Sequence, residues 1–312
     1  MIPVYMINGF LESGKTEFIS FTLSQPYFKT SGNTLLIVCE EGENSYDDKL
    51  LKKTKTIMEI IEDKESFTPE KLSWLERKHK AQRVIIEFNG MWNPKEIELP
   101  SSWEMEQQIT IINGATFPMY YTNMKSLVAE QVRGSELIIF NRCDGIEDLA
   151  SYKRNVKAVN AKAEVVFEGK DGEINQMFEE DLPYDLKSDE LVLDNEGYGI
   201  WYIDSMDNMD RYIGKTVVFD AMAMKPKNFP DGVFVPGRMA LTCCADDMAF
   251  IGYACKYEGA DELKPQQWIR VKAVVKKEYF KDYKGEGPVL YAQSVTPTEK
   301  PKDDVITFGQ QQ

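Results

Sequence analysis

The sequence has one histidine, His79, and only five cysteines among its 312 residues. The histidine lies among basic residues in LERKHKAQR, a setting typical of a solvated side chain, so we do not expect a catalytic triad built on histidine. An odd number of unevenly spaced cysteines does not form a disulfide framework and predicts reduced thiols. No apolar run approaches the ~20 residues that cross a bilayer, and no basic segment with a cleavage site opens the chain. We therefore expect a cytoplasmic protein without membrane insertion.

Positive charge is also scarce, because 37 lysines and arginines face 51 aspartates and glutamates, a net charge of −14. An acidic chain is repelled by nucleic acid and by anionic membranes, so neither is an expected partner. The segment IRVKAVVKKEYFKDYK does combine lysines with aromatic residues, as a nucleic-acid-binding strand would. The acids around it favour a strand with solvated lysines instead. The apolar fraction, 43%, and the charged fraction, 28%, are those of a globular domain.

The first motif is VYMINGFLESGKTEFIS, in which residues 9–16 match G-x-x-x-x-G-K-[ST] between a short apolar strand and a helix. Glycines let the loop turn its N–H groups toward phosphate oxygens. Lys15 would reach the outer phosphates, and the Thr16 hydroxyl would bind Mg²⁺. The alternative is a strand–turn–helix corner that holds no ligand. The loop residues expected to contact the nucleotide are Gly9, Glu12, Ser13, Gly14, Lys15 and Thr16.

Two further strands end in acidic residues. NTLLIVCEEGE, residues 33–43, ends in a turn that carries Glu40 and Glu41, and RVIIEFNGMWNP, residues 83–94, carries Glu87. Acids at the carboxyl ends of strands in a parallel sheet lie where ligands bind, and Glu87 has the Walker B position that organises Mg²⁺. Glu40 and Glu41 are candidate Mg²⁺ residues, directly or through water, or else part of a solvated loop. Glu41 is also a candidate nucleotide contact, and Lys15, Thr16 and Glu87 are the candidate catalytic residues.

A later strand, SELIIFNRCDG, ends in Asn141, Arg142, Cys143 and Asp144. This resembles N-K-x-D, which reads guanine: the aspartate accepts two hydrogen bonds from the base, and adenine would leave that carboxylate unpaired. Arg142 stands where lysine is usual and can stack on a base. A polar turn after a strand is the alternative. The order of the motifs favours the guanine interpretation.

Strands alternate with helices through the first half of the chain, which predicts an α/β P-loop NTPase domain with a mostly parallel sheet over residues 1–180. Within it, residues 46–80 have a polar and mostly helical pattern, with a helix start at Thr68. Short strands separated by turns, with no long helix, then predict a small all-β barrel of OB type. The expected segments after the first domain are an acidic linker at 181–198, the barrel at 199–300 and a disordered tail at 301–312.

The order of these motifs resembles the CobW-type GTPases, relatives of the UreG and HypB proteins. The family's acidic E-x-x-G-E turn is matched at Glu40–Glu43 and its E-x-x-G at Glu87–Gly90, and Pro94 also fits. The resemblance implies GTP hydrolysis with Mg²⁺, coupled to handling of a metal such as zinc or cobalt. The family's C-x-C-C motif is missing, since residues 44–86 contain no cysteine. Thiolates would select zinc there, so the metal part of the resemblance lacks its usual ligands.

The second half resembles a small domain of unknown function that also occurs beside membrane permeases. The matching residues are Arg238, Thr242, Cys243, Cys244 and Asp247, followed by WIRV at 268–271. Cys243, Cys244, Cys255 and Asp247 could supply a zinc site. Adjacent residues of one strand point to opposite faces, however, and small free cysteines are common in cores, which favours packing.

The sequence as a whole predicts a slow GTPase of the CobW type, with zinc as a second candidate cofactor. The alternative is a regulatory or adaptor module that binds GTP as a switch and engages a protein partner in transport or metal homeostasis. A nucleic-acid-binding ATPase is the third hypothesis, and the guanine motif and the net charge of −14 oppose it.

Overall fold

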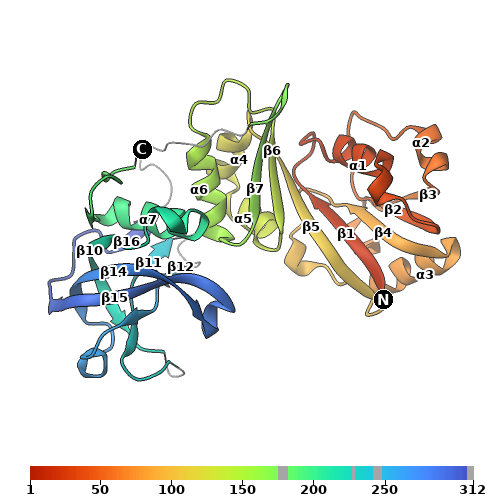
Figure 1. Ribbon diagram of the computed structural model, residues 1–312. Helices are drawn as coiled ribbons and strands as arrows, with labels where there is room; N and C mark the ends of the chain where they lie inside the picture. Colours follow the sequence, from red (N-terminus) through yellow and green to blue (C-terminus); the bar gives the residue numbers. More distant parts are fainter. Residues whose placement is uncertain (175–181, 227–228, 242–247, 308–312) are drawn as a thin grey trace. The chain divides into compact units, whose positions relative to one another are not determined.

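The computed structural model describes residues 1–174, 182–226, 229–241 and 248–307. The chain divides into two compact units, one of residues 1–149 and 162–176 and one of residues 150–161 and 177–312. Each unit has its own sheet and its own apolar core (Figure 1). None of the helices in these described ranges is long and apolar enough to cross a membrane.

The sheet of the first unit has eight strands in the order β3-β2-β4-β1-β5-β6-β7-β8. The strands pair in parallel except for the short β8, which is antiparallel to β7. The mostly parallel sheet predicted from the sequence is therefore confirmed. The strands are β1 (Ile2–Asn8), β2 (Asn33–Val38), β3 (Thr56–Ile60), β4 (Ala81–Glu87), β5 (Trp103–Asn113), β6 (Leu137–Asn141), β7 (Glu164–Gly169) and β8 (Gly172–Glu173).

Helices cover both faces of this sheet, because successive residues of its buried strands point to opposite sides. One core cluster joins Ile19 and Leu23 to Leu36 of β2, and another joins Leu72 to Leu35 of the same strand. Figure 1 shows α1 and α2 on one side of these strands and α3 on the other. The helices of this unit are α1 (Lys15–Ser24), α2 (Asp48–Lys53), α3 (Pro69–His79), α4 (Phe117–Asn123) and α5 (Lys125–Arg133).

The segment 46–80 contains a strand that the sequence did not predict. Residues Thr56–Ile60 form β3 at the edge of the sheet, parallel to β2, where a mostly helical segment was expected. Its β-branched residues suit a strand, and pairing with β2 overrides the short helical pattern before it. The helix start at Thr68 is confirmed, since its hydroxyl accepts a hydrogen bond from the backbone N–H of Lys71 (3.3 Å).

The second unit is built on a mostly antiparallel sheet in the order β12-β11-β13-β15-β14-β10-β9. β16 pairs with β11, and β11 also pairs with β10. The prediction of a β-rich second domain is thus confirmed. Its elements are α6 (Leu149–Val159, almost wholly in this unit), β9 (Glu190–Val192), α7 (Asn195–Asp207), β10 (Thr216–Met224), β11 (Val233–Leu241), β12 (Met248–Gly252), β13 (Cys255–Lys256), β14 (Trp268–Phe280), β15 (Gly285–Pro297) and β16 (Val305–Thr307).

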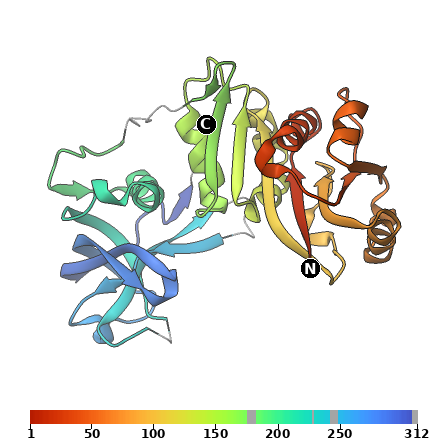
Figure 2. The ribbon, with the colours of Figure 1, turned by 45° about the vertical axis from the view of Figure 1, so that its right-hand side comes forward.

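Helix α7 is the main departure from the sequence-based expectation for this half, which contained no long helix. Figure 2 shows α7 beside the strands of its unit, and Trp201 and Tyr198 on it are fully buried among the strand residues. The aromatic residues share one face of this helix, but Ile200 and Ile203 lie away from that face, so no single apolar stripe can be read from the sequence.

Two segments expected as a linker and as a tail contain regular elements. Residues 181–198, expected as a linker, contain β9 and the beginning of α7. Residues 301–312, expected as a tail, contain β16, which pairs with β11 from Met239 to Leu241. Pairing with other strands forms β9 and β16, and no local sequence pattern indicates such pairing.

Trp201 should be a main stabilising residue of the second unit, because its ring contacts Tyr198, Phe219 and Tyr253 at centroid distances of 5.6, 5.7 and 5.4 Å. We expect Trp201→Ala to lower the free energy of unfolding by about 3–5 kcal/mol, measured by urea denaturation. The matched control is Trp74→Ala, a tryptophan that is 47% exposed, with an expected loss of about 1 kcal/mol or less. Equal losses in both variants would contradict this assignment.

Candidate functional site

The loop of residues 9–14 connects β1 to α1 and requires glycine at both ends. Gly9 and Gly14 have φ angles of 139° and 103°, which side chains disfavour. A Cβ on Gly9 would lie 2.2 Å from the carbonyl oxygen of Ile111, and one on Gly14 would lie 2.6 Å from Asn141 Nδ2. The loop is therefore packed directly on the ends of β5 and β6.

The ammonium of Lys15 is turned back onto this loop and is buried, with 3% of the residue exposed. Its Nζ donates to the carbonyl oxygens of Gly9 (2.9 Å) and Phe10 (3.0 Å) and forms an ion pair with Glu40. The structure thus brings together two candidate site residues, Lys15 and Glu40, in an ion pair that the motifs did not predict. Glu40 takes the position of an anionic partner for the lysine.

Glu87, at the end of β4, accepts hydrogen bonds on both carboxylate oxygens. Thr16 Oγ1 donates to Oε1 (2.8 Å), and the hydroxyl of Tyr46 donates to Oε2. Only 4% of Glu87 is exposed, and this burial raises the pKa of its carboxyl, although both hydrogen bonds and Lys15 oppose the shift. Burial also raises the pKa of Tyr46, so its hydroxyl remains a donor. Sequence reasoning missed Tyr46, because nothing in a tyrosine three residues after an acidic turn indicates where its hydroxyl points.

These groups line one pocket with about 260 Å³ of empty space, part of it open to solvent. The acidic turn closes one side, because the backbone N–H of Glu43 donates to Glu12 Oε1 (2.8 Å) and Asn44 Nδ2 donates to Glu17 Oε1 (2.5 Å). Glu41 is exposed and does not line the pocket. The lining residues are Leu11, Glu12, Gly14, Lys15, Thr16, Glu17, Glu40, Gly42, Asn44 and Glu87.

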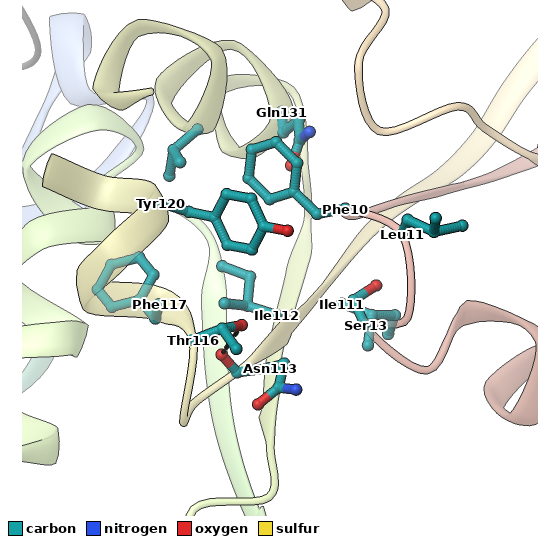
Figure 3. Close-up of a pocket in the computed structure, with 11 residues that line it drawn as sticks. Phe10, Leu11, Ser13, Ile111, Ile112, Asn113, Thr116, Phe117, Tyr120 and Gln131 are labelled. Carbon is teal, nitrogen blue, oxygen red and sulfur yellow. Dashed lines mark hydrogen bonds between the residues drawn. The ribbon is translucent and has the colours of Figure 1, made fainter. Parts of the chain in front are cut away.

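The surroundings of Gly90 explain why the E-x-x-G motif ends in glycine. A Cβ there would lie 2.4 Å from the carbonyl oxygen of Gly9, so the segment after β4 can approach the phosphate loop only without a side chain. Gln131 of α5 holds this approach, since its Nε2 donates to the Gly90 oxygen (2.7 Å). Next to Gln131, Phe10 of the loop stacks on Tyr120 at a centroid distance of 4.0 Å (Figure 3). The phosphate loop is thus held by α4, α5 and β4 together.

The candidate guanine motif also contacts the phosphate loop. Asn141 Nδ2 donates to the carbonyl oxygen of Ser13 (2.7 Å), and Arg142 Nη1 donates to that of Glu12 (2.8 Å). Asn141 Oδ1 is buried and has no hydrogen-bond partner within the described residues. The Asp144 side chain is exposed, and its carboxylate accepts the backbone N–H of Lys170 (3.1 Å). The structure therefore places the motif next to the loop.

The candidate zinc residues are only partly visible, because Cys243, Cys244 and Asp247 lie outside the described residues. Cys255 is fully buried in the core of the second unit, and burial raises the pKa of its thiol to about 12. At neutral pH it is therefore a thiol packed in the core. No group of three or more metal-binding side chains is found within the part of the chain that the structure describes.

Residues 3–167 match the model of the CobW/HypB/UreG nucleotide-binding domain, which is more than half of the chain. The protein belongs to this family. Residues 169–306 match the DUF1980 C-terminal domain. Both resemblances noted in the sequence are thus confirmed.

Curated relatives are distant. The zinc chaperone CobW from a Sinorhizobium species is 23% identical, over 55% of this chain and 60% of that protein. The UPF0703 protein YcgQ of Bacillus subtilis is 22% identical, over 31% of this chain and 34% of its own length. The chain thus spans about 60% of the first relative and about a third of the second.

Two solved structures are also similar to this chain. The Zn(II)-bound YjiA GTPase from E. coli has a TM-score of 0.42 and 20% identity, over 56% of this chain and 59% of that chain. The hydrogenase maturation factor HypB from Archaeoglobus fulgidus has a TM-score of 0.42 and 16% identity, over 54% of this chain and 81% of that chain.

Removing the Tyr46 hydroxyl should make stability depend more on pH. The pKa of Glu87 is raised in the folded protein, so its contribution to stability falls as pH rises above the unfolded value of about 4.3. A hydrogen bond to the ionised carboxylate is worth more than one to the neutral acid. The stability lost in Tyr46→Phe should therefore grow by about 1 kcal/mol between acid and neutral pH, measured by urea unfolding.

The control is Tyr46→Phe in a Glu87→Gln background, where the loss should be independent of pH. A pH-independent loss with Glu87 present would show that the Tyr46 hydroxyl does not act on this carboxylate.

Proposed function

We propose that this protein binds GTP with Mg²⁺ and hydrolyses it slowly. The observation that carries the proposal is the 2.8 Å hydrogen bond from Thr16 to Glu87, beside the buried Lys15 ammonium. A P-loop hydroxyl and a strand-end acid in this arrangement are the groups that hold Mg²⁺ and its waters in P-loop NTPases. Membership of a family of nucleotide-binding domains supports the same conclusion.

Each residue has a role under this proposal. Lys15 would exchange Glu40 and the loop carbonyls for phosphate oxygens, and the turned N–H groups of residues 9–14 would face the same phosphates. The hard oxygen donors of Thr16 and Glu87 suit Mg²⁺, with Glu40 and Glu41 as further ligands, directly or through water. Bound Mg²⁺ would neutralise charge on the phosphates. Glu87 would keep Thr16 oriented when the site fills.

Guanine selection is assigned to Asn141 and Asp144. The exposed Asp144 carboxylate keeps lone pairs for the N1–H and amino group of guanine after it accepts the Lys170 N–H. Arg142 would stack on the base. The contact of Asn141 with Ser13 supports this assignment, because it ties the base-reading residues to the phosphate loop.

Slow turnover follows from the charges of the phosphate pocket, whose lining contains one cation, Lys15, and no arginine. An arginine that stabilises the transition state accounts for large rate gains in related GTPases. This favours the second candidate function, a nucleotide-gated adaptor with little hydrolysis. In that function, nucleotide binding would change the acidic turn, whose Glu40 is engaged by Lys15.

The second unit is proposed to be an OB-type barrel that serves a protein partner in metal homeostasis or transport. The pairing of β11 with both β10 and β13 supports closure of the sheet. The names of the zinc chaperone and of the Zn(II)-bound YjiA GTPase support a link to zinc, for which Cys243, Cys244 and Asp247 remain the candidate ligands. We propose that the protein works in the cytoplasm.

The test is phosphate release from GTP with Mg²⁺, with and without zinc, and with ATP as the control nucleotide. We expect slow release that is selective for GTP. A response to zinc would support the metal-linked function, and no response would favour the adaptor. Equal activity with ATP would overturn the roles of Asn141 and Asp144.

Glu40 should compete with the nucleotide for Lys15. We expect Glu40→Gln to bind GDP about tenfold more tightly than the wild type when EDTA removes Mg²⁺, because the lysine no longer leaves an ion pair. The measurement is isothermal titration calorimetry. Glu62→Gln is the control, since it removes the same charge from an exposed residue that does not line the pocket and should change affinity little. If the two variants behave alike, the Lys15–Glu40 pair does not control binding.

A further inference from the structure

A second pocket of the first unit is lined by cations and by no carboxylate. The pocket lies at the amino ends of β2 and β4, whereas the phosphate loop lies at the carboxyl ends of the strands. It holds about 540 Å³ of space, part of it open to solvent. In a chain with a net charge of −14, such a cluster stands out. The lining residues are Leu23, Ser24, Phe28, Lys29, Thr30, Leu50, Lys53, Thr54, Lys55 and Arg83.

Arg83 is the buried cation of this pocket, with 8% of the residue exposed. Its Nε and Nη2 donate to Thr34 Oγ1 (3.2 and 2.9 Å), and its Nη1 donates to the carbonyl oxygen of Phe28 (2.7 Å). Its guanidinium carbon lies 3.9 Å from the centre of the Phe28 ring. A guanidinium has five N–H donors, so one on Nη1 and one on Nη2 are left over. Within the described ranges, no carboxylate forms an ion pair with Arg83.

The three lysines of the pocket are also without acidic partners. Lys29, Lys53 and Lys55 are exposed, and none of them forms an ion pair with a described residue. Lys55 Nζ donates to the carbonyl oxygen of Ser31 (3.0 Å). A structural explanation accounts for part of this: Lys53 complements the dipole at the end of α2, and Arg83 ties residues 26–28 to β2. This explanation leaves the charge of the buried Arg83 guanidinium uncompensated, and an uncompensated buried charge lowers the stability of the folded protein.

We propose that this pocket binds a small anion through phosphate or carboxylate oxygens. The two remaining N–H groups of Arg83 would meet those oxygens at the base of the pocket, and Lys29 and Lys53 would neutralise them at its mouth. Leu23, Phe28 and Leu50 offer apolar contact to the rest of such a molecule. The volume falls in the range of small-molecule sites, roughly 300–1,000 Å³. This site is independent of the nucleotide function proposed above.

The pocket is tested by isothermal titration calorimetry with inorganic phosphate and, separately, with citrate. All proteins carry Lys15→Ala, which weakens the phosphate loop as a competing site. We expect saturable binding of at least one of the two anions. We also expect Lys29→Ala/Lys53→Ala to weaken that binding about tenfold or more, since two charged contacts are lost. Both lysines are exposed, so this variant should fold.

The matched control is Lys49→Ala/Lys52→Ala, which removes the same charge from exposed positions on α2 that do not line the pocket. It should bind the anion nearly as the parent does. Phosphate binding without citrate binding would identify a phosphorylated ligand, and the reverse a carboxylate. Binding of neither anion, or equal weakening in both double variants, would overturn the proposal.

Discussion

The buried carboxylate of Glu87 is the group on which the phosphate site depends. A carboxylate that is 4% exposed is costly unless donors satisfy it, and this chain supplies two, from Thr16 and Tyr46. These donors belong to the first turn of α1 and to the segment before α2. One hydrogen-bonded group therefore holds together the phosphate loop, the acidic turn and the end of β4.

The pocket around Glu87 is unusually acidic for a site that would receive phosphates. Glu12, Glu17 and Glu40 line it as well, and Lys15 is the single cation among the lining residues. Four carboxylates and one ammonium repel a triphosphate unless a divalent cation accompanies it. The charges of the pocket therefore favour a site in which Mg²⁺ and nucleotide bind together.

The pocket at the amino ends of the strands of the same sheet is basic instead of acidic. β4 carries Arg83 near its beginning and Glu87 at its end, and α1 runs from Thr16 beside Glu87 to Leu23 beside Arg83. Two short, rigid elements thus connect an acidic pocket to a basic one.

Much of the first unit could be predicted from its sequence. A buried parallel strand is a continuous apolar run, and the glycine–lysine–threonine and acidic motifs at the ends of such runs are local, so β1, β2, β4 and β6 and the candidate site on them are readable. β3 could not be predicted, because an edge strand is specified by its neighbour. α7 was not predicted for a related reason, because the burial of Trp201 and Tyr198 depends on strands that pack against them and lie elsewhere in the sequence.

The sequence by itself determined the order of the motifs, the alternation of strands with helices and the family, because each motif, strand and helix is a run of neighbouring residues. Only the tertiary structure decided which side chains meet. It paired Lys15 with Glu40, placed Tyr46 on Glu87 and, among the residues it describes, gave Arg83 no carboxylate partner. The two contacts join residues 25 and 41 positions apart, and their energies depend on burial, which no local pattern encodes.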